Sequence, residues 1–165
     1  TYPGADYAEL LERCRASLPC GDAEADSRLR SFSRQIQSLP LERAQELYTQ
    51  TFDLNPVCSL EVGWQLYGED YTRGSFLVAM REQLRRYRIP ESPELPDHLT
   101  HVLALRDRLE PEEAREFTKA FLLPAMNKML AGLNGQQNPY RDLLLAIEKL
   151  LSSDARDGST EAPDV

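Results

Sequence analysis

The sequence predicts an all-α fold, a single helical bundle of roughly eight to ten short helices. Three observations predict it. Apolar residues recur every three or four positions over most of the 165 residues, which is the spacing of an amphipathic helix. Proline and glycine interrupt this pattern at short intervals and limit the length of each helix. No stretch alternates apolar and polar residues as a half-buried strand would.

Five apolar stripes predict the helices of the N-terminal half. They are Tyr7 to Leu18, Leu29 to Leu39, Leu41 to Tyr48, Val57 to Tyr67, and a segment that starts after Gly68 and ends near Tyr87. Pro40 suits the first turn of the third helix. Gly68 can end the fourth, and Glu69 or Asp70 can cap the fifth. Residues 89–96 contain three prolines and cannot form a continuous helix.

The C-terminal half is predicted to hold the remaining helices. One follows from Leu99 to about Leu109, and Pro111 with two glutamates makes a strong start for the next. Pro124 should kink or split that helix. The last amphipathic helix follows Asn138-Pro139 and ends at Leu151. We therefore expect a helical domain over residues 1–151 and a polar, acidic tail over residues 152–165.

Composition narrows the class of partner. The net charge is -8 and the isoelectric point about 4.8. This acidic balance disfavours binding of nucleic acid and favours encounter with a basic partner.

The sequence also bears on the cellular compartment. No apolar run approaches the roughly 18 residues of a membrane-spanning helix, and the N-terminus lacks the layout of a secretory signal. Cys14, Cys20 and Cys58 are odd in number and widely spaced. They are typical of reduced cytoplasmic thiols.

The most informative stretch is Glu94-Leu95-Pro96-Asp97-His98-Leu99, between two predicted helices. Asp97 and His98 could form a pH-responsive recognition pair or include a general base. The simpler interpretation is that Asp97 caps the helix and His98 packs or faces solvent. No nucleophile accompanies the pair in a recognisable local motif. This combination favours a recognition protein over an enzyme.

A metal site is the main chemical alternative. His98 and His101 are spaced so that they could share a helical face. Zinc would need two further ligands, and the sequence has neither Cys-x-x-Cys nor His-Glu-x-x-His. We expect no metal and no resident cofactor. A small helical enzyme or metal-binding protein that uses these histidines and nearby acids remains an alternative, as does a helical adaptor with an unrelated partner.

Two further pairs have both a structural and a functional interpretation. Trp64 and Tyr67 share a face with Leu60 and could pack in the core or form an aromatic wall for an apolar peptide. Asp70 and Arg73 could cap and pair locally, or contact a partner.

Several of these motifs also resemble a known family. Those that carry the likeness are Leu47-Tyr48, Thr51-Phe52-Asp53-Leu54, Ser59-Leu60, Tyr67-Gly68, Asp70, Arg73-Gly74 and Glu94-Leu95-Pro96-Asp97. Over about Leu41 to Leu109 the chain resembles the TorD/NarJ-type molybdoenzyme chaperones, or redox enzyme maturation proteins, and within them the nitrate reductase delta-subunit branch. His98 is similar to the last residue of the wider family's Glu-Pro-x-Asp-His signature. Leu95 departs from it by standing at the proline position.

The resemblance implies an all-α, single-domain, cytoplasmic protein without catalytic activity. Members bind the N-terminal segment of an apo molybdoenzyme catalytic subunit, in some cases a twin-arginine signal or its remnant, until the molybdenum cofactor is inserted. The residues that we expect to contact such a partner are Trp64, Tyr67, Asp70, Arg73, Glu94, Pro96, Asp97 and His98. We expect neither nucleic-acid binding nor insertion into a membrane, and both a monomer and a dimer fit the sequence.

Overall fold

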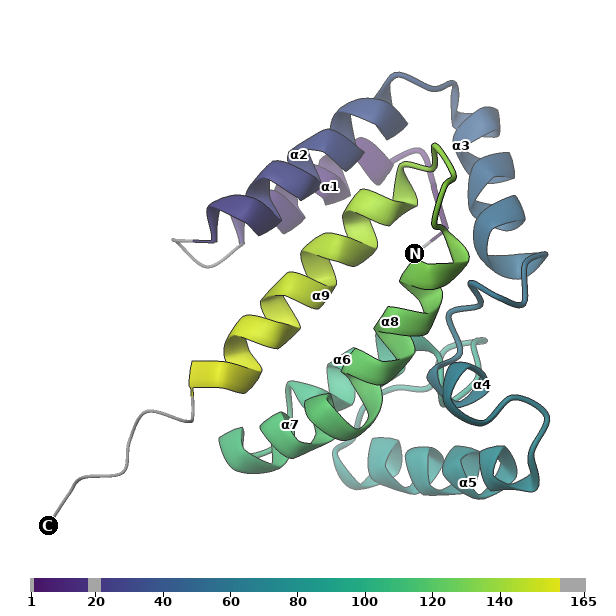
Figure 1. The fold of residues 1–165 in the computed structure, drawn as a ribbon, viewed down its shortest axis with the longest axis vertical. Helices are drawn as coiled ribbons and strands as arrows, with labels where there is room; N and C mark the ends of the chain where they lie inside the picture. Colours follow the sequence, from purple (N-terminus) through teal and green to yellow (C-terminus); the bar gives the residue numbers. More distant parts are fainter. Residues whose placement is uncertain (1, 18–21, 158–165) are drawn as a thin grey trace, which may run out of the picture.

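The structure, a computed structural model, describes residues 2–17 and 22–157 (Figure 1). Its helices are α1 (Tyr7–Ala16), α2 (Ala23–Gln37), α3 (Leu41–Tyr48), α4 (Val62–Tyr67), α5 (Tyr71–Arg86), α6 (Leu99–Arg106), α7 (Pro111–Phe117), α8 (Leu123–Gly132) and α9 (Tyr140–Asp157), with two π-helical segments, η1 (Thr49–Asp53) and η2 (Thr118–Leu122). Because η1 continues α3 and η2 joins α7 to α8, the described ranges form eight separate helical rods. The prediction of an all-α bundle is confirmed.

The helices form two groups that meet along α8. In Figure 1, α2 runs alongside α9, and α8 lies on the other side of α9. Helix α1 packs on α2, whereas α4 packs on α8 and α5 contacts α4 and α6 at the opposite edge of the molecule. The chain segment that leads from η1 to α4 therefore crosses between the two groups.

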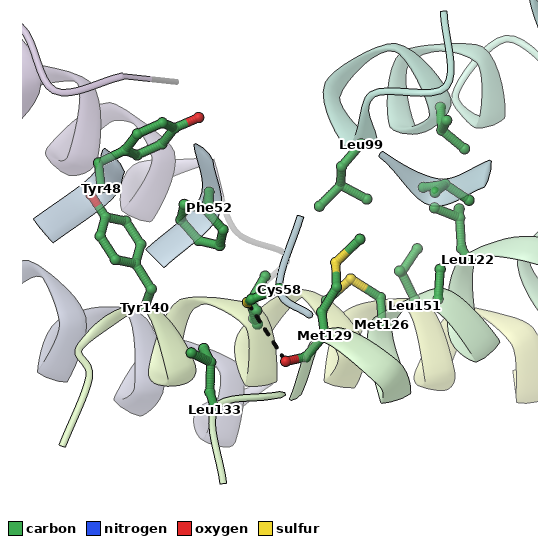
Figure 2. Close-up of a cluster of buried hydrophobic side chains, with 14 of the residues drawn as sticks. Tyr48, Phe52, Cys58, Leu99, Leu122, Met126, Met129, Leu133, Tyr140 and Leu151 are labelled. Atoms are coloured by element: carbon green, nitrogen blue, oxygen red, sulfur yellow. Dashed lines mark hydrogen bonds between the residues drawn. The ribbon is translucent and has the colours of Figure 1, made fainter. Parts of the chain in front are cut away.

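A buried cluster holds that crossing segment in place. Figure 2 shows Tyr48 and Phe52 beside Tyr140 at the start of α9, with Cys58 lying over Met129 of α8. The rings of Phe52 and Tyr140 are 4.9 Å apart between centroids, and the Cys58 thiol donates to the Met129 carbonyl at 3.6 Å. Burial raises the pKa of the Cys58 thiol to about 12, so this side chain acts as a packed apolar group. The segment approaching α4 is thus fixed against α8 and α9.

Helix α4 is shorter than the apolar stripe from Val57 to Tyr67 predicts. It begins only at Val62, and Val57 and Leu60 precede it. Asn55 forms a turn by accepting the Val57 N–H at 3.2 Å. The Leu60 carbonyl then accepts the Leu99 N–H at 2.8 Å and cannot join a helix. Pairing with a distant segment has overridden the local helical pattern.

Two other helix boundaries differ from those that the sequence predicts. Pro124 does not break the rod, and a π-helical stretch directly precedes the turn that contains it, where the missing proline N–H alters the hydrogen-bond pattern. Helix α9 passes Leu151 and continues to Asp157, because Ala155 extends the buried stripe and Asp154 pairs with Arg106 of α6. Residues 158–165 of the predicted tail lie outside the described residues, and the division into domain and tail stays a prediction.

Candidate functional site

Two backbone hydrogen bonds join the start of α4 to the start of α6. The Val62 N–H donates to the Asp97 carbonyl at 2.8 Å, and the Leu99 N–H donates to the Leu60 carbonyl at 2.8 Å. Between them Glu61 and His98 form an isolated antiparallel bridge. This junction brings residues 60–62 beside the Glu94–Leu99 stretch that the sequence singles out.

A cavity of about 270 Å³ opens beside this junction. Its lining residues are Tyr48, Phe52, Asp53, Pro56, Ser59, Leu60, Glu61, Trp64, Arg73, Glu94 and His98. Small-molecule sites span roughly 300–1,000 Å³, so this volume suits a side chain of a partner more than a large ligand. Four of the predicted contact residues line it, namely Trp64, Arg73, Glu94 and His98.

The other four predicted residues do not line the cavity. The Tyr67 ring packs on Phe76 at 5.6 Å between centroids, and Pro96 and Asp97 are buried. Asp70 is exposed and caps α5 by accepting the Thr72 N–H at 2.8 Å. The hydrogen bond from the Thr72 hydroxyl, and then that from its N–H, lowers the pKa of the Asp70 carboxyl group. Contact with a partner stays a prediction for all eight residues, those that line the cavity included.

The cavity carries an excess of negative charge. Asp53, Glu61 and Glu94 supply three carboxyl groups, against the single guanidinium of Arg73. Burial raises the pKa of Glu61, and the neighbouring Asp97 carboxylate adds to that rise. An incoming cation would offset the cost of holding these carboxylates together. Tyr48, Phe52 and Trp64 add aromatic faces, which also attract cations, so the lining suits a basic side chain.

Trp64 forms a wall of this cavity and lies only half-buried. Its indole N–H donates to the Pro56 carbonyl at 2.8 Å, which fixes the orientation of the ring. The Arg73 guanidinium carbon lies 5.3 Å from the ring centroid, within cation–π range. Trp64 thus lines a cavity and is not part of the buried core, and its contact with an apolar peptide stays a prediction.

Asp97 lies beneath the cavity with no exposed surface. Its Oδ2 accepts from Arg73 Nε at 3.5 Å, and its Oδ1 is buried without a hydrogen-bond partner. The carboxylate therefore reaches the cavity only through Arg73. Asp97 also does not cap α6, since His98 occupies the N-cap position. Its position suits it to hold Arg73 against Trp64.

His98 and His101 each hold a defined hydrogen-bond arrangement. His98 Nδ1 accepts the Thr100 N–H at 3.3 Å, so in the neutral ring the proton resides on Nε2. His101 Nδ1 donates to the Leu95 carbonyl at 2.9 Å and its Nε2 accepts the Ser92 N–H at 3.3 Å. His101 thereby anchors the proline-rich segment on either side of Glu94. No three His, Cys, Asp or Glu residues converge as a metal site within the ranges described.

Stability should fall on acidification because of His98. Burial lowers the pKa of its imidazole, so between about 6.5 and the lower folded value the unfolded chain binds more protons than the folded one. The free energy of unfolding should therefore decrease as the pH falls through this window. His98→Asn keeps an N-cap acceptor and should have a shallower pH dependence in urea denaturation. Equal slopes for the two proteins would contradict this prediction.

Two acids that line the cavity, Glu61 and Asp53, are not among the contact residues that the sequence predicts. Glu61 lies in the middle of a stripe that predicts a helix, and nothing local indicates that its backbone pairs with residue 98. Asp53 stands in the quoted Thr51-Phe52-Asp53 motif, where a turn-shaping role is the simpler expectation. It lies at the end of η1, and π-helical segments are frequent at functional sites.

None of the helices in the ranges described has the length and apolar character required to span a bilayer.

Comparisons with known proteins relate this chain to a family. A family model described as "Nitrate reductase delta subunit" matches residues 16–146, a range that contains every residue lining the cavity. A relative in Escherichia coli (strain K12), the nitrate reductase molybdenum cofactor assembly chaperone NarJ, is 30% identical over 183 residues. That match covers 99% of this chain and 76% of the relative. The protein of the same name in Escherichia coli O157:H7 matches with the same identity and the same coverage.

Proposed function

This chain belongs to the nitrate reductase delta subunit family, and we propose that it is an assembly chaperone for the catalytic subunit of a nitrate reductase. It binds the apo subunit and supports insertion of the molybdenum cofactor. The family consists of assembly chaperones rather than enzymes. The chaperone acts in the cytoplasm and catalyses no reaction.

The recognised element is the N-terminal segment of the catalytic subunit. The observation that carries this proposal is the cavity with three carboxyl groups and three aromatic walls, because such a lining attracts a guanidinium or ammonium group. Glu94 is exposed at the mouth, and Glu61 is half-buried. A basic side chain of the segment would enter between them.

Preferential binding explains how such a chaperone can assist maturation. A protein that binds the open apo subunit better than the closed one stabilises the open form by mass action. Cofactor insertion closes the subunit and removes the recognised surface. The chaperone then dissociates without any chemical step.

Calorimetric titration with a synthetic N-terminal peptide of the nitrate reductase catalytic subunit from the same organism tests this function. We expect saturable binding, and weaker binding of a peptide whose Lys and Arg residues are replaced by Gln. Trp64 is the single tryptophan of the chain, so its fluorescence should change on binding. Absence of saturable heat, together with no co-purification of the full subunit, would refute the proposal.

A further inference from the structure

We propose that a groove on the other flank of Trp64 is a second subsite of the same interface and takes an apolar side chain of the bound segment. This inference rests on the proposed chaperone function. The groove has a volume of about 570 Å³, within the range of ordinary binding sites. It is lined by Pro56, Val57, Trp64, Gln65, Gly68, Lys128, Ala131 and Gly132.

The groove is continuous with the acidic cavity. Pro56 and Trp64 line both, and the hydrogen bond from the Trp64 indole to the Pro56 carbonyl makes these two residues one rigid partition. A segment that places one side chain in the cavity can continue across this partition. Its next side chains then lie over the groove between α4 and α8.

The chemistry of the groove is opposite to that of the cavity, because none of its lining residues is acidic. The Gln65 amide donates to the Ser59 carbonyl at 2.9 Å, and Lys128 Nζ donates to the Gln65 carbonyl at 2.6 Å. With these polar groups engaged, the apolar side chains that line the groove are those of Val57, Ala131 and the shared partition. The Lys128 charge at the edge repels a second cation.

The shape of the groove depends on the close approach of α8 to the Pro56–Val57 turn. A Cβ at Gly132 would lie 3.0 Å from the Val57 carbonyl oxygen and 2.9 Å from Val57 Cγ1. Because Gly132 has no side chain, the turn can rest directly on the helix, and 58% of Val57 remains exposed. An exposed apolar side chain on such a supported turn offers contact area to a partner at little ordering cost.

These observations assign one occupant to the whole surface. It is an N-terminal segment of the catalytic subunit that presents a basic side chain to the cavity and an apolar side chain to the groove. Burial of one apolar side chain contributes enough for about a tenfold or larger gain in affinity. The need for both a basic and an apolar side chain would let the protein discriminate the client segment from other basic peptides.

The substitution Ala131→Glu tests the groove. Ala131 is exposed, so the change should leave folding intact while placing a carboxylate where the apolar side chain binds. Ala120→Glu is the matched control, because Ala120 is an exposed alanine of the same rod and lines neither site. Both variants add the same charge and attract a basic peptide equally at long range. We expect at least about a tenfold higher Kd for Ala131→Glu only.

A set of peptides then identifies the contact. Each apolar residue of the N-terminal peptide is replaced in turn by alanine and titrated against both variants. One of these peptide replacements should abolish the difference in Kd between Ala131→Glu and Ala120→Glu. Replacing the basic residues of the peptide should leave that difference in Kd in place. Equal affinity of both variants for the unmodified peptide would overturn the groove proposal and leave the chaperone function standing. Failure of the unmodified chain to bind the peptide and the subunit would instead overturn the function.

Discussion

Replacing Gly63 with alanine is expected to destabilise the protein by about 2 kcal/mol, the middle of the range for overpacking a filled interior. A Cβ there would lie 2.6 Å from Asp97 Oδ2 and 2.9 Å from Phe76 Cδ1. Neither neighbour can move freely. Asp97 is fully buried beneath Arg73, and the Phe76 ring packs against Tyr67 and Phe121. The added methyl group should therefore displace the carboxylate that holds Arg73.

Urea denaturation of Gly63→Ala beside Gly74→Ala checks this expectation. Gly74 is exposed in α5, and a Cβ at that position meets nothing within 4 Å. Alanine in a helix interior is favoured over glycine by about 1 kcal/mol, so Gly74→Ala should stabilise the protein. The emission of Trp64 should also shift in Gly63→Ala, because Arg73 lies over its ring. A gain of stability in both variants would contradict the close approach of Gly63 to Asp97.

Replacing Trp64 with alanine is expected to raise the Kd for the client segment by roughly 30-fold or more, as for the central aromatic of an interface. The residue lines both the acidic cavity and the apolar groove, so its loss removes a contact from each. Since Trp64 is only half-buried, the loss of stability should stay below the roughly 3–5 kcal/mol of a fully buried tryptophan.

Calorimetry and thermal melts separate these two effects of Trp64→Ala. Trp64→Phe keeps an aromatic partition but loses the hydrogen bond to Pro56, and it should bind with intermediate affinity. A folded Trp64→Ala variant with unchanged affinity would remove Trp64 from the interface.

The sequence predicts the helical fold well because its helices obey local rules. The apolar periodicity, the positive φ of Gly68 at the end of α4 and the Asp70 cap of α5 all act within a few residues. The wrong start of α4 has a non-local cause, since the Leu60 carbonyl pairs with Leu99 rather than within a helix. The local periodicity of apolar residues contains no information about such a long-range hydrogen bond.

The candidate site was predictable only in part for the same reason. Glu94 and His98 belong to one motif. Trp64 shares an apolar stripe with Leu60, and Arg73 belongs to the Arg73-Gly74 motif. Asp97 shares the motif but is buried, because its carbonyl accepts from Val62 and its side chain turns under Arg73. Glu61 enters the cavity through a pairing across the fold. The motif thus indicates the region of the site, whereas packing across the fold decides which of its side chains line the cavity.

The junction between residues 60–62 and 97–99 is made of peptide groups, which every residue except proline supplies in full. Substitution of the side chains around it leaves these two bonds available. The side chains that line the cavity can consequently change one residue at a time while the backbone junction that positions them persists.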